Sequence, residues 1–207
     1  MTPLEFTFFL LAWGLAGASP GPATLAIAST SMNRGRAAGI AVAAGIVAGS
    51  ATWGIAAALG MSAVMLANAW AVEILRYVGA AYLIFLGYKA LRSAMSDKPM
   101  TQARAKSGSL KTIFVKGMML HVTNPKAIFS WGAVFAIVVP PGSTPQDIAY
   151  TFLALVIVSN IVFFGYALLF STAAMVRGYQ KLRRPFEFCF GLLFGLAGLK
   201  ILTAKLA

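Results

Sequence analysis

The sequence predicts an all-α integral membrane protein with six transmembrane helices, arranged as two inverted three-helix repeats. Composition is the first reason, because 59% of the 207 residues are hydrophobic and only 11% are charged, whereas about a quarter of the residues in a soluble domain are charged. The apolar residues also fall in runs near the roughly 20 needed to cross a bilayer. Finally, the first and fourth runs are interrupted by proline. Discontinuous helices at matching positions of two halves are typical of a transporter's substrate site.

The six hydrophobic segments form two halves joined by a polar linker. They lie at approximately residues 4–32, 37–66, 72–92, 111–140, 147–176 and 185–204. We therefore predict a first three-helix repeat over residues 1–92 and a second over residues 111–207, within one membrane domain. Polar and charged residues dominate the linker, residues 93–110, which indicates a flexible cytoplasmic connection rather than a folded domain.

The interruptions have similar chemistry. The first is Ser-Pro-Gly-Pro at residues 19–22, and the second is Thr-Asn-Pro-Lys at residues 123–126. A proline inside a helix lacks the backbone N–H and clashes with the preceding turn, so carbonyl and amide groups are released from the helix. Lipid cannot satisfy those groups. Both breaks are therefore expected inside the protein or along a polar cavity.

Basic residues predict the orientation of the chain in the membrane. The net charge is +12, but its distribution favours membrane topology over a nucleic-acid-binding face. The first, third and fifth connections hold most of the basic residues: Arg34, Arg36, Lys89, Arg92, Lys98, Arg104, Lys106, Lys111, Lys116, Arg177, Lys181, Arg183 and Arg184. The positive-inside rule makes these connections cytoplasmic and places both termini outside. Arg76 and Lys205 are mild exceptions.

The first break contains four candidate binding residues: Ser19, Pro20, Gly21 and Pro22. Glycine lets the backbone approach a ligand closely, while the two prolines stiffen the turn. A helix that restarts after Pro22 would present its N-terminal amides and partial positive charge, which suit a carboxylate. Ser19 could cap this helix or contact the ligand. The alternative is a simple kink that binds nothing.

Lys126 is the main candidate of the second break. If the fourth segment enters the hydrocarbon near Lys116, Lys126 lies about 15 Å deeper, near the middle of a core about 30 Å thick. A charge at that depth is costly unless it is paired or hydrated, which indicates a functional site. Alternatively, its ammonium caps carbonyls released by Pro125. Asn124 can bind the freed backbone or the substrate, and Asn160 either lines the cavity or joins two helices.

Other kinds of site lack the residues they need. The five acidic residues are predicted to lie in loops or near segment ends, so no carboxylate is expected in the centre of the membrane to carry a proton. One histidine and one cysteine, Cys189, provide neither a metal-ligand set nor a disulfide. No catalytic motif of a hydrolase is present. We expect no cofactor, no metal and no enzymatic activity.

Several runs together resemble the LysE/RhtB family of amino-acid exporters (the lysine exporter and homoserine–threonine efflux type). The first break resembles that family's first loop region, together with Arg-Gly-Arg-Ala-Ala-Gly at residues 34–39. Residues 77–83 and 85–87 resemble its third segment, and residues 117–127, ending in Asn-Pro-Lys-Ala, resemble its fourth. The matches are ordered along the chain and span nearly all of it.

The resemblance implies a homodimeric exporter of amino acids or related metabolites in the bacterial inner membrane, driven by the proton-motive force. It also implies six helices with the first and fourth broken. Several family members carry an acid after the second-segment glycine, where this chain has Gly49-Ser50. That difference weakens any inference to a cationic substrate and leaves the carrier of the coupling ion unidentified.

We therefore expect a secondary exporter of a small zwitterion, with a multi-pass chain embedded in the lipid bilayer. The helix end after Pro22 would receive a carboxylate, and Lys126 would act as its counter-charge or as a gate. A channel or passive pore for small metabolites is the alternative, since it could use the same broken helices. A membrane enzyme or redox carrier is disfavoured by the single cysteine.

Overall fold

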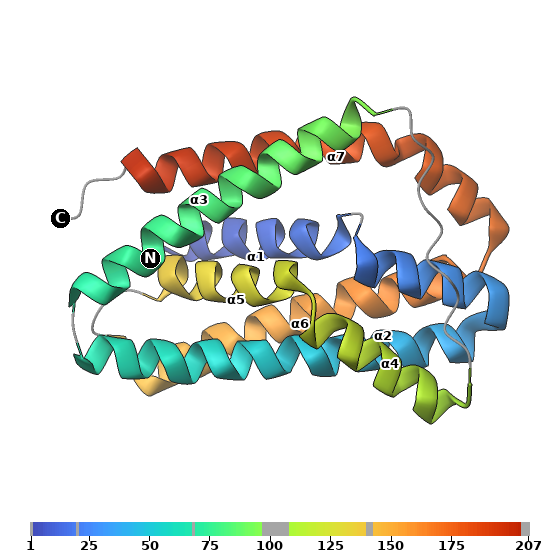
Figure 1. Ribbon diagram of the computed structural model, residues 1–207, viewed down its shortest axis with the longest axis horizontal. Helices are drawn as coiled ribbons and strands as arrows, with labels where there is room; N and C mark the ends of the chain where they lie inside the picture. The colour runs from blue at the N-terminus through green and yellow to red at the C-terminus, as the bar shows by residue number, and fades with distance from the viewer. Residues whose placement is uncertain (1, 20, 68, 97–107, 140–142, 204–207) are drawn as a thin grey trace.

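The computed structural model describes residues 2–19, 21–67, 69–96, 108–139 and 143–203, and these residues form helices without any β-strand, as predicted (Figure 1). The helices are α1 (Pro3–Ala18), α2 (Pro22–Ala67), α3 (Ala69–Ala94), α4 (Leu110–Val122), α5 (Pro125–Val138), α6 (Pro145–Leu169) and α7 (Ala173–Thr203).

Both interruptions lie where the prolines predict them. Helix α1 ends at Ala18 and α2 begins at Pro22, while α4 ends at Val122 and α5 begins at Pro125. Proline fits the first helical position because the N–H it lacks would have no intrahelical partner there. Asn124 caps α5, since its side-chain oxygen accepts a hydrogen bond from the amide of Lys126 at 3.1 Å.

The first connection is tighter than the predicted loop. Helical structure continues from Pro22 to Ala67 except at Gly35, whose φ of 80° lies in the left-handed region that glycine adopts without strain. Figure 1 shows the chain reversing direction within α2. After the turn, Gly39 packs so closely that a Cβ there would lie 2.0 Å from the Ser31 hydroxyl oxygen.

The fifth connection was predicted wrongly. A loop was expected over residues 177–184, but α6 ends at Leu169 and α7 already begins at Ala173, so the basic stretch is helical and Pro185 lies inside the helix. The cause is that arginine, lysine, glutamine and leucine are all strong helix formers. A basic helix can also extend beyond the hydrocarbon, since its backbone hydrogen bonds are internal.

The connections are sorted between the two ends of the helical bundle. In Figure 1 the reversal within α2 and the α6–α7 junction lie at one end, whereas the α2–α3 and α5–α6 junctions lie at the other. The start of α1 and the end of α7 also lie at this second end. Among the described helices, two are individually long and apolar enough to cross a membrane, in residues Pro22–Gly60 and Pro145–Leu169; α1 and α5 are apolar but shorter because of the breaks.

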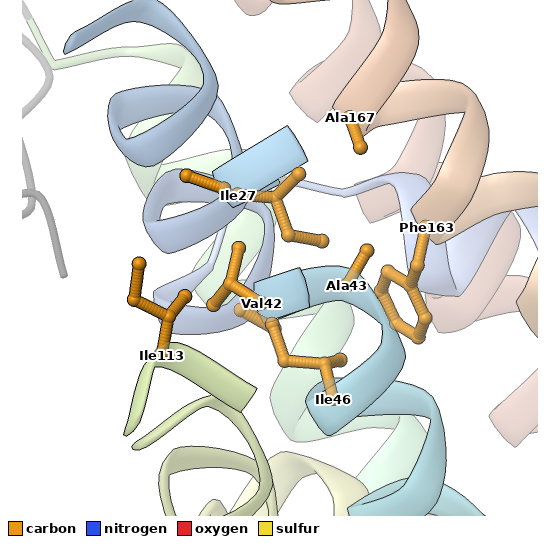
Figure 2. Packing of buried hydrophobic residues seen from close by; sticks show 9 residues of the cluster. Ile27, Val42, Ala43, Ile46, Ile113, Phe163 and Ala167 are labelled. Carbon is orange, nitrogen blue, oxygen red and sulfur yellow. The ribbon is translucent and has the colours of Figure 1, made fainter. Parts of the chain in front are cut away.

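Glycines allow the close packing of α2 on α4 and of α3 on α7. A Cβ at Gly45 would lie 2.0 Å from the carbonyl oxygen of Phe114, and one at Gly191 would lie 2.4 Å from Leu91. Gly45, Gly49 and Gly191 therefore serve close helix packing. Helices α2, α4 and α6 also share an apolar core around Ile27, Val42, Ala43, Ile46, Ile113, Phe163 and Ala167 (Figure 2).

Candidate functional site

The two helix breaks meet at Lys126. Its ammonium donates a hydrogen bond to the carbonyl oxygen of Ala16 at 2.9 Å and another to the hydroxyl of Ser19. The Ser19 hydroxyl in turn donates to the same Ala16 carbonyl at 2.8 Å. The first turn of α5 is thereby joined to the C-terminal turn of α1, where carbonyl groups have no helical partner and attract a cation.

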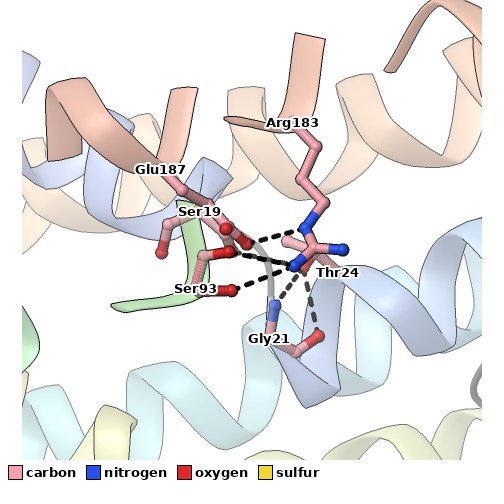
Figure 3. Close-up of polar contacts among 6 residues, drawn as sticks. All are labelled: Ser19, Gly21, Thr24, Ser93, Arg183 and Glu187. Carbon is pink, nitrogen blue, oxygen red and sulfur yellow. Dashed lines mark hydrogen bonds and ion pairs between the residues drawn. The ribbon is translucent and has the colours of Figure 1, made fainter. Parts of the chain in front are cut away.

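Side chains satisfy the backbone that the first break releases. The Gly21 amide donates to the Thr24 hydroxyl at 3.0 Å, and that hydroxyl lies 3.3 Å from the Ser19 carbonyl oxygen. On the other side, the Tyr166 hydroxyl of α6 donates to the Ala18 carbonyl at 2.5 Å. Figure 3 draws the Gly21–Thr24 contacts beside the Arg183–Glu187 pair of α7. The break is consequently a defined polar structure and not merely a kink.

A small inner cavity of about 50 Å³ lies on one side of Lys126. Its polar lining residues come from both breaks and from α2, α4, α5 and α6: Ser19, Thr24, Ser50, His121, Asn124, Lys126, Ser130 and Ser159. Two tryptophan side chains, Trp13 and Trp131, form part of the wall. This volume suits a water molecule or two and is too small for an amino acid, since a water occupies about 30 Å³ in the liquid.

A larger cavity of about 430 Å³ is lined by the same lysine. Helices α3, α5 and α7 supply the remaining walls, including Lys89, Ser93, Phe129 and Glu187. Ser19, Gly21, Asn124 and Lys126 are common to both cavities. This volume falls in the range of about 300–1,000 Å³ that holds small ligands. The contact between Lys126 and Ser19 therefore lies where the two cavities adjoin.

Positive potential dominates the larger cavity. Lys89 and Lys126 line it, and so do Pro22, the first residue of α2, and Asn124, the N-cap of α5. Each helix N-terminus adds partial positive charge from amides without helical partners. Such a combination favours an anionic group such as a carboxylate.

The structure brings together most of the predicted site residues. Ser19, Gly21, Pro22, Asn124 and Lys126 all line the larger cavity. Pro125 is the first residue of α5, and Pro20 lies outside the described residues.

Asn160 does not join this site. Its side-chain amide donates to the Val156 carbonyl of its own helix at 2.8 Å, and it lines neither cavity. The physical reason is helix geometry, because successive residues point about 100° apart. The preceding residue, Ser159, faces the inner cavity instead.

Several site residues could not be singled out from sequence. Ser50 accepts a hydrogen bond from the Trp131 indole at 3.0 Å, and Ser159 accepts one from the Trp13 indole at 2.9 Å. His121 is buried beside the ring of Phe163. In the sequence, the position of His121 just before the second break was the one feature that could have indicated a site residue. The serines carried no such feature, since hydroxyl groups are common in helices that pack closely.

The expectation for acidic residues needs a correction. Glu187 does lie near the start of the sixth predicted segment, but it is buried and lines the larger cavity. Helix α7 begins earlier than expected, so this residue sits inside a helix that packs on α3 and is not at a free segment end.

Apolar helices around a half-buried lysine and a ligand-sized cavity are features of a membrane transporter. The comparison with known families agrees with this class. The chain belongs to the LysE type translocator family, whose model matches residues 15–205. It is thus a multi-pass membrane protein of an efflux family and not an enzyme, as predicted. The described residues contain no cluster of three or more potential metal ligands.

Relatives whose names state a function are similar to this chain over most of their length. The threonine efflux protein of Escherichia coli (strain K12) is 32% identical over 195 residues, which are 90% of this chain and 92% of that protein. The homoserine/homoserine lactone efflux protein of Salmonella typhimurium (strain LT2) is 31% identical over 200 residues, 95% of each chain. The leucine efflux protein of Enterobacter sp. (strain 638) is 30% identical, covering 80% of this chain and 77% of that one. No solved structure matches this chain.

Proposed function

We propose that this protein is a secondary active exporter of amino acids or related small zwitterionic metabolites across the bacterial inner membrane, driven by the proton-motive force. The observation that carries the proposal is the meeting of both helix breaks at Lys126, beside a cavity of about 430 Å³. The names of the relatives, which describe threonine, homoserine and leucine efflux, support amino-acid export.

The substrate's carboxylate binds at the positive wall of the larger cavity. Lys126 and Lys89 provide full charges there, and the N-termini of α2 and α5 provide partial ones. Ser19, Gly21 and Asn124 add polar groups at the same wall. Ser50 replaces the acid found in several family members, which favours neutral amino acids over cationic ones.

Lys126 acts as a gate between the two cavities. Its hydrogen bonds to Ala16 and Ser19 hold the breaks together and separate the larger cavity from the inner one. A carboxylate that binds the ammonium competes with those two oxygens, so substrate binding weakens the contact. This competition links substrate binding to the opening of the gate between the two cavities.

This conformation faces the cytoplasm in our proposal. The larger cavity includes Lys89 and Ser93 near the end of α3, next to the predicted cytoplasmic linker. The opposite path is blocked by an aromatic cluster in which the Trp13 and Trp131 rings lie 4.7 Å apart. The chain would form six spans in two inverted repeats, residues 1–92 and 111–207, with both termini outside. This arrangement would allow the same site to face either side of the membrane in turn.

A channel or passive pore remains the second candidate function, and one experiment distinguishes it from a secondary active exporter. Cells with and without the protein are loaded with amino acids as dipeptides, and efflux is followed with and without an uncoupler. We expect the protein to accelerate efflux of one or a few amino acids in a saturable, uncoupler-sensitive way. Unsaturable efflux that ignores the uncoupler would support the pore, and unchanged efflux across the panel would refute amino-acid export.

A further inference from the structure

Glu187 on α7 is a buried acid, and one of its carboxylate oxygens has no hydrogen-bond partner among the described residues. It is only 5% exposed and lines the larger cavity. One carboxylate oxygen, Oε1, lies 3.1 Å from Nε of Arg183. The other oxygen, Oε2, is buried without a hydrogen-bond partner in the described part of the chain. An unsatisfied oxygen on a buried carboxylate is costly, so a role confined to the Arg183 pair does not explain it.

The position of this carboxylate is fixed by α3. Nη2 of Arg183 donates a hydrogen bond to the Ser93 hydroxyl at 3.1 Å, and Ser93 lies in the last turn of α3 (Figure 3). Arg183 thus binds Oε1 of Glu187 through Nε and the Ser93 hydroxyl of α3 through Nη2. The remaining oxygen is available to a group that enters the cavity.

Glu187 is surrounded by basic residues from the neighbouring helices and from its own helix. Lys89 of α3 and Lys126 of α5 line the same cavity, and Arg183 precedes it on α7. Glu187 is the one acidic side chain among the described residues of the lining. A cationic group entering this cavity is repelled by the lysines and attracted to this carboxylate alone.

We propose that Glu187 binds the ammonium group of the exported substrate. This inference rests on the proposed function and deepens it. It assigns the carboxylate and the ammonium of one substrate molecule to oppositely charged side chains of the same cavity. The carboxylate binds at Lys126, and the ammonium donates to Oε2 of Glu187. The substrate class is therefore an α-amino acid with an uncharged side chain. The corresponding 2-hydroxy acid is transported less well, because its neutral hydroxyl can donate a hydrogen bond to Oε2 but brings no positive charge to the buried carboxylate.

Paired probes test this assignment in proteoliposomes containing the purified full chain. L-leucine, L-threonine and L-homoserine are each compared with the 2-hydroxy acid that carries the same side chain. We expect wild-type protein to transport at least one amino acid about tenfold or more faster than its hydroxy acid. In Glu187→Gln this preference falls at least tenfold, because transport of the amino acid slows while that of the hydroxy acid does not.

Two further variants separate recognition from folding. Glu5→Gln makes the same chemical change in the exposed first turn of α1 and should keep the wild-type preference. If Glu187→Gln is not recovered as folded protein, the double variant Arg183→Gln/Glu187→Gln removes the charge of the arginine together with that of the carboxylate and is measured in its place. A structural role alone would slow both probes equally.

The outcomes distinguish this inference from the proposed function. An unchanged preference in Glu187→Gln, or in the double variant, overturns the inference while export itself stands. Failure of the wild-type protein to transport any amino acid of the efflux panel, these three included, overturns both proposals.

Discussion

Lys126 on α5 and Ser19 beside α1 are 107 residues apart in the sequence, yet the lysine ammonium donates a hydrogen bond to the serine hydroxyl. Each residue belongs to a helix break, so this contact joins the two interruptions to one another. It also lies between the small inner cavity and the larger one, because both residues line both cavities.

Ser19→Ala should slow export about tenfold. The substitution removes one of the two acceptors of Lys126, and a hydrogen bond to a charged group contributes about 1.5–3 kcal/mol. The Ala16 carbonyl still holds the ammonium, so the loss is partial. Initial efflux rates from dipeptide-loaded cells measure the effect. Ser171→Ala, at the α6–α7 junction outside both cavities, should export normally; equal loss in both variants would contradict a specific role for Ser19.

Gly45→Ala should destabilise the protein strongly. The added Cβ would lie 2.0 Å from the backbone oxygen of Phe114, so α2 and α4 must move apart. Overpacking of this kind costs about 1–3 kcal/mol. Thermal unfolding of the purified protein in detergent measures the change. Gly132→Ala introduces the same atom where nothing lies within 4 Å, and its unfolding temperature should not fall.

Trp131 and Ser50 should be energetically coupled. The Trp131 indole donates to the Ser50 hydroxyl at 3.0 Å, and both side chains are buried. A double-mutant cycle with Trp131→Phe and Ser50→Ala should give a coupling of about 0.5–1.5 kcal/mol in stability. Additive effects of the two substitutions would show that this hydrogen bond does not stabilise the fold.

Cysteine labelling should place the two ends of the bundle on opposite sides of the membrane. In a Cys189→Ser background, Arg36→Cys reports on the end with the basic reversal of α2, and Gln146→Cys reports on the end where α6 begins. A membrane-impermeant maleimide added to intact cells should label only Gln146→Cys. Labelling of Arg36→Cys alone would reverse the predicted orientation.

Local chemistry explains which parts of the site could be predicted from sequence. Both breaks follow from proline, whose effect on a helix does not depend on distant residues. Lys126 could be recognised because a charge in an apolar segment is unusual wherever that segment packs. These two local signals were sufficient to identify the wall shared by the two cavities.

The remaining site residues depend on tertiary packing. Glu187 was assigned to a segment end because nothing in the sequence shows that α7 starts early and presses this acid against α3. Asn160 was chosen in place of Ser159 because a hydropathy pattern does not define how a uniformly apolar helix is rotated. The role of Ser50 depends on Trp131, which approaches from a helix 81 residues away.

Lys126→Met is the measurement on which the proposed mechanism depends. Methionine keeps an unbranched side chain that is one atom shorter, but it removes the charge and both hydrogen bonds to Ala16 and Ser19. Export from dipeptide-loaded cells should fall to the rate of cells without the protein, while the amount of folded protein in the membrane stays near wild type. Lys111→Met, in the exposed first turn of α4, should export normally. Normal export by Lys126→Met would contradict the assignment of the substrate site to the meeting point of the two helix breaks.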